Sequence, residues 1–207
     1  MDQRERITIS IKKDLLNKID SRIDGLKMRN RSHAIEVIIS DSFGISTIST
    51  AVIMAGGKGA LKLIPAIEDS IVRLEKFGIK KIYIAVGYLG DKIKQSLNRN
   101  FTSEIHYIEG GEGTAGSLNL IKKEIKSTFI IVNIEDILEI ELKKVIDFHQ
   151  HHAPIITAAI KNTDTMKGLY IAEPEIFDFI GNGFSMLEED VFPKLGEKNK
   201  LLVFPLI

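Results

Sequence analysis

The chain of 207 residues contains no cysteine and no tryptophan, and long apolar runs are missing as well. Without cysteine there can be no disulfide framework, thiolate zinc site or cysteine nucleophile, so any metal must have oxygen or imidazole ligands. No window approaches the 18 uninterrupted apolar residues of a membrane span, and the N-terminal MDQRERITIS lacks the apolar core of a signal peptide. We therefore expect a cytoplasmic protein with no membrane contact.

Net charge is also absent, because 28 Lys and Arg balance 28 Asp and Glu. Hydrophobic residues make up 44% of the chain, which is enough to bury a core and excludes disorder as the dominant state. A small asymmetry lies at the start, where residues 1–44 hold nine basic and seven acidic residues. Its meaning depends on where those charges lie.

The first 44 residues predict a strand followed by two helices. Arg6–Ile11 alternates polar and apolar residues with a period of two, which is typical of a half-buried strand. Apolar residues at three- and four-residue spacing then predict a helix over 13–24, which Gly25 can end. After the basic turn Arg29-Asn30-Arg31, Ser32 is the expected N-cap of a second helix that ends near residue 44.

Such a short segment rarely buries a sufficient core alone, so we expect it to fold as a homodimer in which the two N-terminal strands pair. Pairing would turn the isoleucines toward the helices and leave Arg6, Thr8 and Ser10 outward on a ribbon that fits the major groove of double-stranded DNA. Arg31 and Ser32 at the second helix would then meet a backbone phosphate.

This pattern, R-I-T-I-S-I followed by K-K-D-L-L-N-K-I-D and R-S-x-A-I, resembles the ribbon-helix-helix DNA-binding family. The resemblance implies a dimeric βαα fold and sequence-specific DNA binding. An ordinary dimerisation module, or a short cap on the next domain, is the alternative.

The remaining chain has a different periodicity. A Ser/Thr-rich joint covers residues 45–50, and apolar runs then alternate with amphipathic segments. We expect strands at 51–55, 81–86, 105–108 and 128–133 and helices at 67–77, 91–97 and 114–125. This alternation predicts an α/β, Rossmann-like domain with a mostly parallel sheet covered on both faces. The predicted domains are therefore residues 1–44 and 45–207.

A glycine loop, Gly56-Gly57-Lys58-Gly59, follows the first of these strands. Glycines there let backbone N–H groups approach a phosphate, and Lys58 adds a positive charge. The loop fits neither the P-loop nor the dinucleotide fingerprint, so a tight strand-to-helix turn is the alternative.

Motifs along residues 51–207 resemble sugar-1-phosphate nucleotidyltransferases. They are A-V-I-M-A-G-G-K-G, G-I-K-K-I-Y-I-A-V-G-Y-L-G-D-K-I, E-G-T-A-G-S-L, F-I-I-V-N, G-L-Y-I-A-E-P-E-I-F and E-E-D-V-F-P-K-L, in that order. The resemblance implies a nucleotide site lined by Ala55, Gly56, Gly57, Lys58, Gly59, Gly113, Thr114, Ala115 and Gly116. It also implies that Glu135 or Asp136 stands where the family binds its metal.

Several positions depart from that family. Its glycine loop continues into T-R-L-R-P, whereas this chain continues Ala60-Leu61-Lys62-Leu63-Ile64-Pro65 and lacks the arginine. The following Pro-Lys-Pro segment and the Glu-Lys-Pro sugar-binding element have no counterpart, and the chain ends before the second metal aspartate would appear. Because nucleotidyl transfer relies on cations arrayed around the phosphates, these losses predict a domain without catalysis.

Together these patterns favour a homodimeric, DNA-binding transcriptional regulator whose larger domain is non-catalytic and serves effector sensing or oligomerisation. It would need no cofactor, although a nucleotide or sugar nucleotide could be its effector, and a higher oligomer is compatible with this interpretation. The first alternative is an active sugar-1-phosphate nucleotidyltransferase that uses Mg²⁺ and carries a DNA-binding or dimerising tail. The second is an architectural scaffold.

Other polar clusters favour simpler explanations. His149, His151 and His152 fall at an expected helix end, where partly exposed imidazoles are common. The acidic run Glu188-Glu189-Asp190 is typical of the start of a helical turn before Val191.

Overall fold

The computed structural model describes residues 5–23, 28–42, 48–56, 60–87, 90–97, 99–134, 141–161 and 168–206. The chain divides into two compact units, Met1–Thr47 and Ile48–Ile207. Within the described residues, no helix combines the length and apolar character that a membrane crossing requires.

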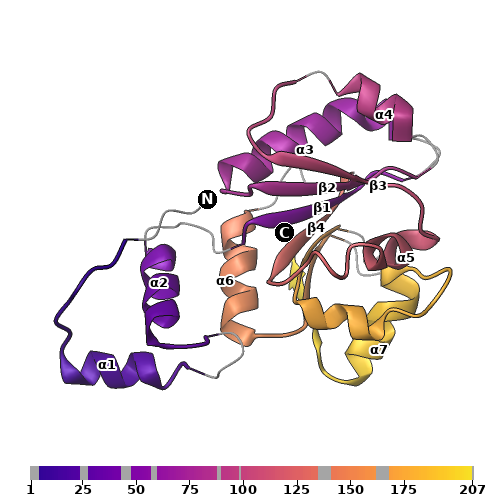
Figure 1. Cartoon of the computed structure of the whole chain (residues 1–207). Helices are drawn as coiled ribbons and strands as arrows, with labels where there is room; N and C mark the ends of the chain where they lie inside the picture. The colour runs from indigo at the N-terminus through magenta and orange to yellow at the C-terminus, as the bar shows by residue number, and fades with distance from the viewer. Residues whose placement is uncertain are drawn as a thin grey trace. The chain divides into compact units, whose positions relative to one another are not determined.

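The described part of the first unit contains two helices, α1 (Lys13–Asp20) and α2 (Arg31–Ser42), which contact each other (Figure 1). The strand expected over residues 6–11 is not formed, because residues 5–12 have no regular secondary structure. A strand needs a neighbour for its backbone hydrogen bonds, and the described part of the single chain offers none.

Both helix ends in this unit differ from expectation. Helix α1 ends at Asp20 instead of residue 24, and Gly25, its expected terminator, lies outside the described residues. Helix α2 is capped by Asn30, whose side-chain oxygen accepts a hydrogen bond from the backbone N–H of His33 at 3.0 Å. Ser32 therefore lies within the first turn of α2 and is not its N-cap.

The second unit is an α/β domain built on a seven-stranded sheet with strand order β3-β2-β1-β4-β6-β5-β7. The strands are β1 (Thr50–Met54), β2 (Lys81–Ala85), β3 (Glu104–Ile108), β4 (Phe129–Asn133), β5 (Ile156–Ile160), β6 (Gly168–Ala172) and β7 (Leu201–Pro205). The helices are α3 (Ile64–Lys76), α4 (Gly90–Ser96), α5 (Gly113–Asn119), α6 (Leu142–His152) and α7 (Phe192–Glu197). Among these strands β6 runs antiparallel to its neighbours, while the other pairs are parallel.

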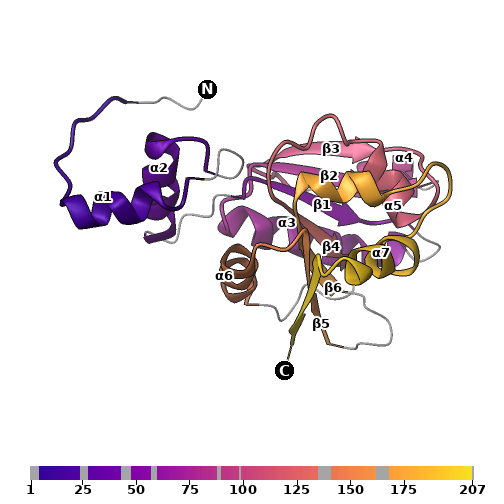
Figure 2. The same ribbon diagram turned by 90° about the horizontal axis from the view of Figure 1, so that it is seen from below.

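Helices cover both faces of the sheet, and alternate residues of each strand feed two separate cores (Figures 1 and 2). In β1, Ala51 and Ile53 pack with α3, α4 and α6. Val52 and Met54 pack on the other face with α5, α7 and the segment before α7, residues 185–191. The side-chain period of two in a strand produces this division. The expected Rossmann-like, mostly parallel α/β fold is therefore confirmed for this unit.

Candidate functional site at the carboxyl edge of the sheet

After the carboxyl ends of β1 and β2 the chain reaches two glycines, Gly56 and Gly87. The N–H of Ala55 donates to the carbonyl of Ala85 at 2.9 Å, and Gly56 follows as an exposed residue. Gly87 has a φ of +55°, and a Cβ on it would lie 3.5 Å from the Cα of Gly56. Two exposed glycines therefore lie side by side at the edge where open α/β sheets bind ligands.

Three residues of the predicted glycine loop, Gly57, Lys58 and Gly59, lie outside the described residues. The predicted metal ligands Glu135 and Asp136 lie outside them as well. After the loop, a short 3₁₀ turn (Ala60–Leu63) leads into α3, which has Pro65 in its first turn. The side chain of Lys62 in that turn is exposed.

The predicted residues Gly113, Thr114, Ala115 and Gly116 form the first turn of α5, and they are joined to the segment before α7. The N–H groups of Ala115 and Gly116 both donate to the carbonyl of Ser185, at 3.0 and 3.1 Å. The N–H of Leu187 donates to the hydroxyl of Thr114 at 2.9 Å. Two backbone donors that a helix N-terminus could offer to an anion are therefore already used within the protein.

The glycine at 113 is required by this close approach. Its φ is +79°, and a Cβ would lie 2.3 Å from the carbonyl oxygen of Ser185. Any side chain at residue 113 would therefore separate α5 from the segment before α7.

A polar contact that the sequence did not single out lies at the end of β4. Tyr170 of β6 donates its hydroxyl to Oε1 of Glu188 at 2.6 Å, and Asn133 donates its amide to the same oxygen at 3.5 Å. Burial, followed by the charge of Glu188, raises the pKa of the Tyr170 hydroxyl above its ordinary value, so it remains a donor at neutral pH. Glu188 belongs to a π-helical turn, Leu187–Val191, a rare conformation that often marks functional sites.

The described residues contain no group of three or more His, Asp or Glu side chains that could hold a metal ion. The histidine cluster in α6 is instead divided by burial. His149 is 1% exposed, its Nδ1 lies 2.8 Å from the hydroxyl of Thr157, and its Nε2 lies 3.3 Å from Oε1 of Glu173. The expectation of a partly exposed imidazole is therefore wrong for His149, although His151 and His152 are exposed.

The residues expected to bind DNA lie in the first unit. Arg6, Thr8 and Ser10 are exposed in the segment without regular structure. Arg31 is bound within the unit, because its Nε and Nη2 donate to the two carboxylate oxygens of Asp20 at 2.8 and 2.7 Å. The Arg31 hydrogen bonds hold the pKa of Asp20 below its ordinary value.

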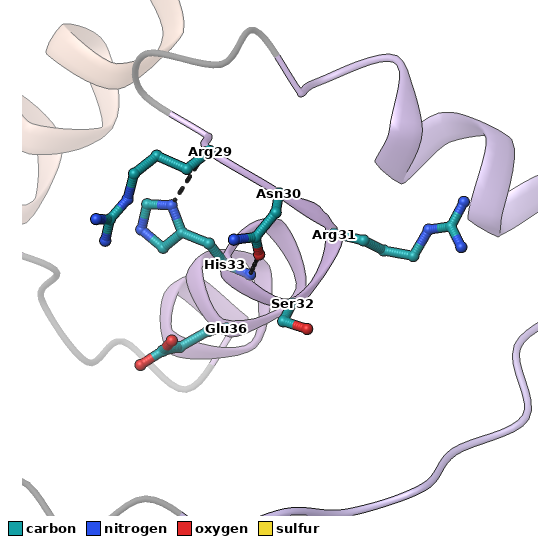
Figure 3. A pocket seen from close by; sticks show the side chains of 6 residues that line it. All are labelled: Arg29, Asn30, Arg31, Ser32, His33 and Glu36. Atoms are coloured by element: carbon teal, nitrogen blue, oxygen red, sulfur yellow. Dashed lines mark hydrogen bonds between the residues drawn. The ribbon is translucent and has the colours of Figure 1, made fainter.

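A pocket of about 350 Å³ lies at the start of α2, lined by Arg29, Asn30, Arg31, Ser32, His33 and Glu36 (Figure 3). The guanidinium of Arg31 points away from the ring of His33 in this view. Arg29 and Ser32 are exposed, so the pocket is a surface depression at a helix end.

Comparison with known proteins finds several mannose-1-phosphate guanyltransferases among the similar sequences. No protein-family profile matches the chain. A mannose-1-phosphate guanyltransferase of Candida glabrata is 26% identical over 186 residues, which cover 69% of this chain and 50% of that protein. The chain therefore spans about half the length of the curated relatives it matches.

Solved structures share the fold of the second unit. HddC from Yersinia pseudotuberculosis, crystallised with GMP-PN, superposes with a TM-score of 0.60 at 19% identity, over 77% of this chain and 91% of HddC. The inositol-1-phosphate CTP transferase of T. maritima gives a TM-score of 0.59 at 12% identity, over 77% and 86% of the two chains. The larger unit is a nucleotidyltransferase-like domain.

These similarities overturn the main functional expectation. The matched proteins are sugar-1-phosphate guanyltransferases and structures of the same fold, and they conflict with a DNA-binding transcriptional regulator. They favour the enzyme alternative instead. The basic residues of the N-terminal unit, from which DNA binding was inferred, are an insufficient basis, because one of them is bound to Asp20 and the ribbon is not formed.

Proposed function

We propose that the larger unit transfers a nucleotidyl group from a nucleoside triphosphate to a sugar 1-phosphate and releases pyrophosphate. The observation that carries this proposal is the glycine-lined carboxyl edge of β1 and β2 in a nucleotidyltransferase-like sheet. A guanine nucleotide and a hexose 1-phosphate are the proposed substrates, because the curated relatives are named mannose-1-phosphate guanyltransferases.

The base would lie on the backbone of Ala55 and Gly56 beside Gly87. Glycine loops after a strand bring backbone N–H groups toward phosphates, and Lys58 would supply charge to them. Lys62 is the next cation along the chain and lies before α3. We assign the triphosphate to these two lysines, because Leu61 occupies the position where the resembling family has an arginine.

The sugar-1-phosphate nucleotidyltransferases that this chain resembles also use Mg²⁺. In such enzymes the ion is held by one or two carboxylates together with substrate phosphates. Glu135 or Asp136, two and three residues after the end of β4, would supply the protein carboxylate. The bound ion would neutralise charge on the phosphates.

A pyrophosphate-release assay across the nucleoside triphosphates and common sugar 1-phosphates, with Mg²⁺, tests the proposal. Turnover is expected, fastest with GTP, and Lys58→Ala should slow it about 10²–10³-fold because it removes one positioned charge. Lys76→Ala is the matched control, since Lys76 ends α3 at the opposite edge of the sheet. Absence of turnover with every pair, together with absence of nucleotide binding in calorimetry, would refute the proposal.

We further propose that the first unit forms a homodimer by pairing Arg6–Ile11 of two copies, which would complete a ribbon-helix-helix arrangement. Ile7 is 70% exposed and Ile9 is 50% exposed, and Leu15 of α1 is also more than half exposed. A unit of 47 residues rarely covers such side chains by itself, whereas a paired ribbon would bury them against the helices.

Light scattering on the full chain tests this pairing. Ile9→Lys should give a monomer, because it would place a charge on the buried face of the ribbon, while Thr8→Lys should remain dimeric because Thr8 would face outward. A monomeric wild type, or equal dissociation of both variants, would refute the arrangement.

A further inference from the structure

Glu188 lies one strand away from the proposed nucleotide site. Asn133, which contacts its carboxylate, pairs with Met54 in the parallel register of β4 and β1. Met54 directly precedes Ala55 and Gly56, where the glycine loop starts. The Glu188 carboxylate therefore lies at the same edge of the sheet as the glycine loop.

The side chain of Glu188 is held in place by a buried neighbour. The Tyr170 hydroxyl that donates to Oε1 belongs to a ring that is 1% exposed and packs edge-on against Phe192 at a centroid distance of 5.1 Å. A buried ring with two torsions cannot easily follow a moving carboxylate, so this contact fixes Glu188. The turn that carries Glu188 is joined to α5 through the Leu187 to Thr114 hydrogen bond.

The contacts that the described residues make with this carboxylate involve one of its two oxygens. The hydrogen bonds from Tyr170 and from Asn133 both end on Oε1. Within the described part of the chain, no side chain makes a hydrogen bond or ion pair with Oε2, and no Lys or Arg pairs with Glu188. Glu188 is half-buried, so a bound molecule can reach it.

The charge of the Glu188 carboxylate indicates which part of the two substrates it can bind. An ionised carboxylate repels phosphate groups and accepts hydrogen bonds from hydroxyl groups. The base would lie toward β2, on the other side of β1 from β4 and Glu188. The neutral hydroxyl end of the sugar 1-phosphate is therefore the part that fits this position.

We propose that Glu188, held by Tyr170 and Asn133, binds hydroxyl groups of the sugar 1-phosphate and determines which sugar is accepted. This inference rests on the proposed function of the larger unit. It assigns to Glu188 a role in substrate binding, separate from the cations on the glycine loop.

The variant Glu188→Gln keeps the shape of the side chain and removes its charge. The KM for the sugar 1-phosphate should rise about 10- to 100-fold, because a hydrogen bond to a charged group is lost, while the KM for the nucleotide stays unchanged. Tyr170→Phe should change the same constant in the same direction but less. Glu189→Gln is the matched control, because Glu189 is an exposed neighbour in the same turn.

Deoxy analogues of the accepted sugar 1-phosphate identify the hydroxyl. For the analogue that lacks the contacted hydroxyl, wild type and Glu188→Gln should have the same KM. Neither enzyme can make the contact with this analogue, so the substitution has nothing left to remove. The Mg²⁺ concentration that gives half-maximal activity is measured as well. If Glu188→Gln changes this concentration and leaves the KM for the sugar 1-phosphate unchanged, the inference is overturned and Glu188 is a metal ligand.

The two proposals fail separately. If wild type turns over and Glu188→Gln has the wild-type KM for the sugar, the inference is wrong and the proposed function stands. If wild type shows no turnover, calorimetry with the sugar 1-phosphate decides: tighter binding by wild type than by Glu188→Gln supports the role of Glu188, and equal or absent binding overturns it.

Discussion

His149 illustrates how a residue type can mislead when burial is not known. Its position at a helix end suggested an exposed imidazole, yet the ring lies between Thr157 and Glu173, and Thr128 donates its hydroxyl to the second oxygen of Glu173 at 3.0 Å. The four residues come from α6, from β5 and from positions just before β4 and just after β6, so sequence spacing alone could not bring them together. The described structure leaves no buried side-chain polar atom without a hydrogen bond.

Truncating this ring should therefore be costly. His149→Ala leaves a cavity and removes a partner from both Thr157 and Glu173, so it should lower the free energy of unfolding by about 2–4 kcal/mol. Denaturant unfolding measures the change, with His151→Ala as the control that should stay within about 0.5 kcal/mol. Equal effects of the two substitutions would contradict the network.

A second carboxylate makes stability depend on pH. Burial alone would raise the pKa of Glu75, but hydrogen bonds from Ser103 and Thr102 outweigh it and hold the pKa below its ordinary value of 4.5. Because the folded pKa is the lower one, the ionised group contributes stability above about pH 4.5 and loses it as the pH falls through the folded pKa.

Glu75→Gln should accordingly be less stable than wild type near neutral pH, with a difference that shrinks as the pH falls below 4.5. Denaturant titrations at several pH values test this, and Glu197→Gln, at the exposed end of α7, serves as the comparison. A gap between wild type and Glu75→Gln that does not change with pH would show that the hydrogen bonds do not favour the ionised form.

Elements were predictable where burial alone determines the pattern. Apolar runs such as 128–133 predicted β4, and four of the seven strands were identified in this way. The strand at 6–11 was not formed, because alternation describes a face but supplies no partner to pair with. The helix expected over 114–125 ends at Asn119 and continues as turns, so its start was identified and its end was not.

The candidate site was predictable to a lesser extent. The glycine loop could be proposed from sequence because its residues are contiguous and follow a strand, and its role in nucleotide binding stays a prediction, since residues 57–59 lie outside the described part of the chain. The contact of Asn133, Tyr170 and Glu188 joins β4, β6 and a π-helical turn, and no local pattern links residues so far apart. The acidic run at 188–190 was the available signal, and it was interpreted as the start of a helical turn.

The joint between α5 and the segment before α7 allows a test at the scale of elements. Gly113→Ala adds a Cβ that would clash with the Ser185 carbonyl at a φ of +79°, so it should destabilise by more than the strain of a positive φ alone, about 1–2 kcal/mol. Gly110→Ala is the matched control, because Gly110 has a φ of +88° and nothing lies within 4 Å of its added Cβ. Equal losses in denaturant unfolding would indicate strain without a clash.

At the scale of the whole molecule, the large apolar cores belong to the second unit. Both large apolar clusters consist of residues from position 48 onward. A fragment of residues 48–207 should therefore fold alone, with one cooperative thermal transition and the nucleotide affinity of the full chain. Aggregation of this fragment, or a broad transition, would mean that the first unit is part of a shared core.

The place of β7 in the sheet has a consequence for synthesis on the ribosome. Strand β5 is buried along its whole length, and one of its edges is covered by β7, which is made after the other described strands of this sheet. At about 5–20 residues per second, the interval between Ile160 and Leu201 lasts seconds, and during it an apolar strand edge stays open to other nascent chains. Translation speed and chaperone supply should therefore affect the yield of folded protein more than its final stability.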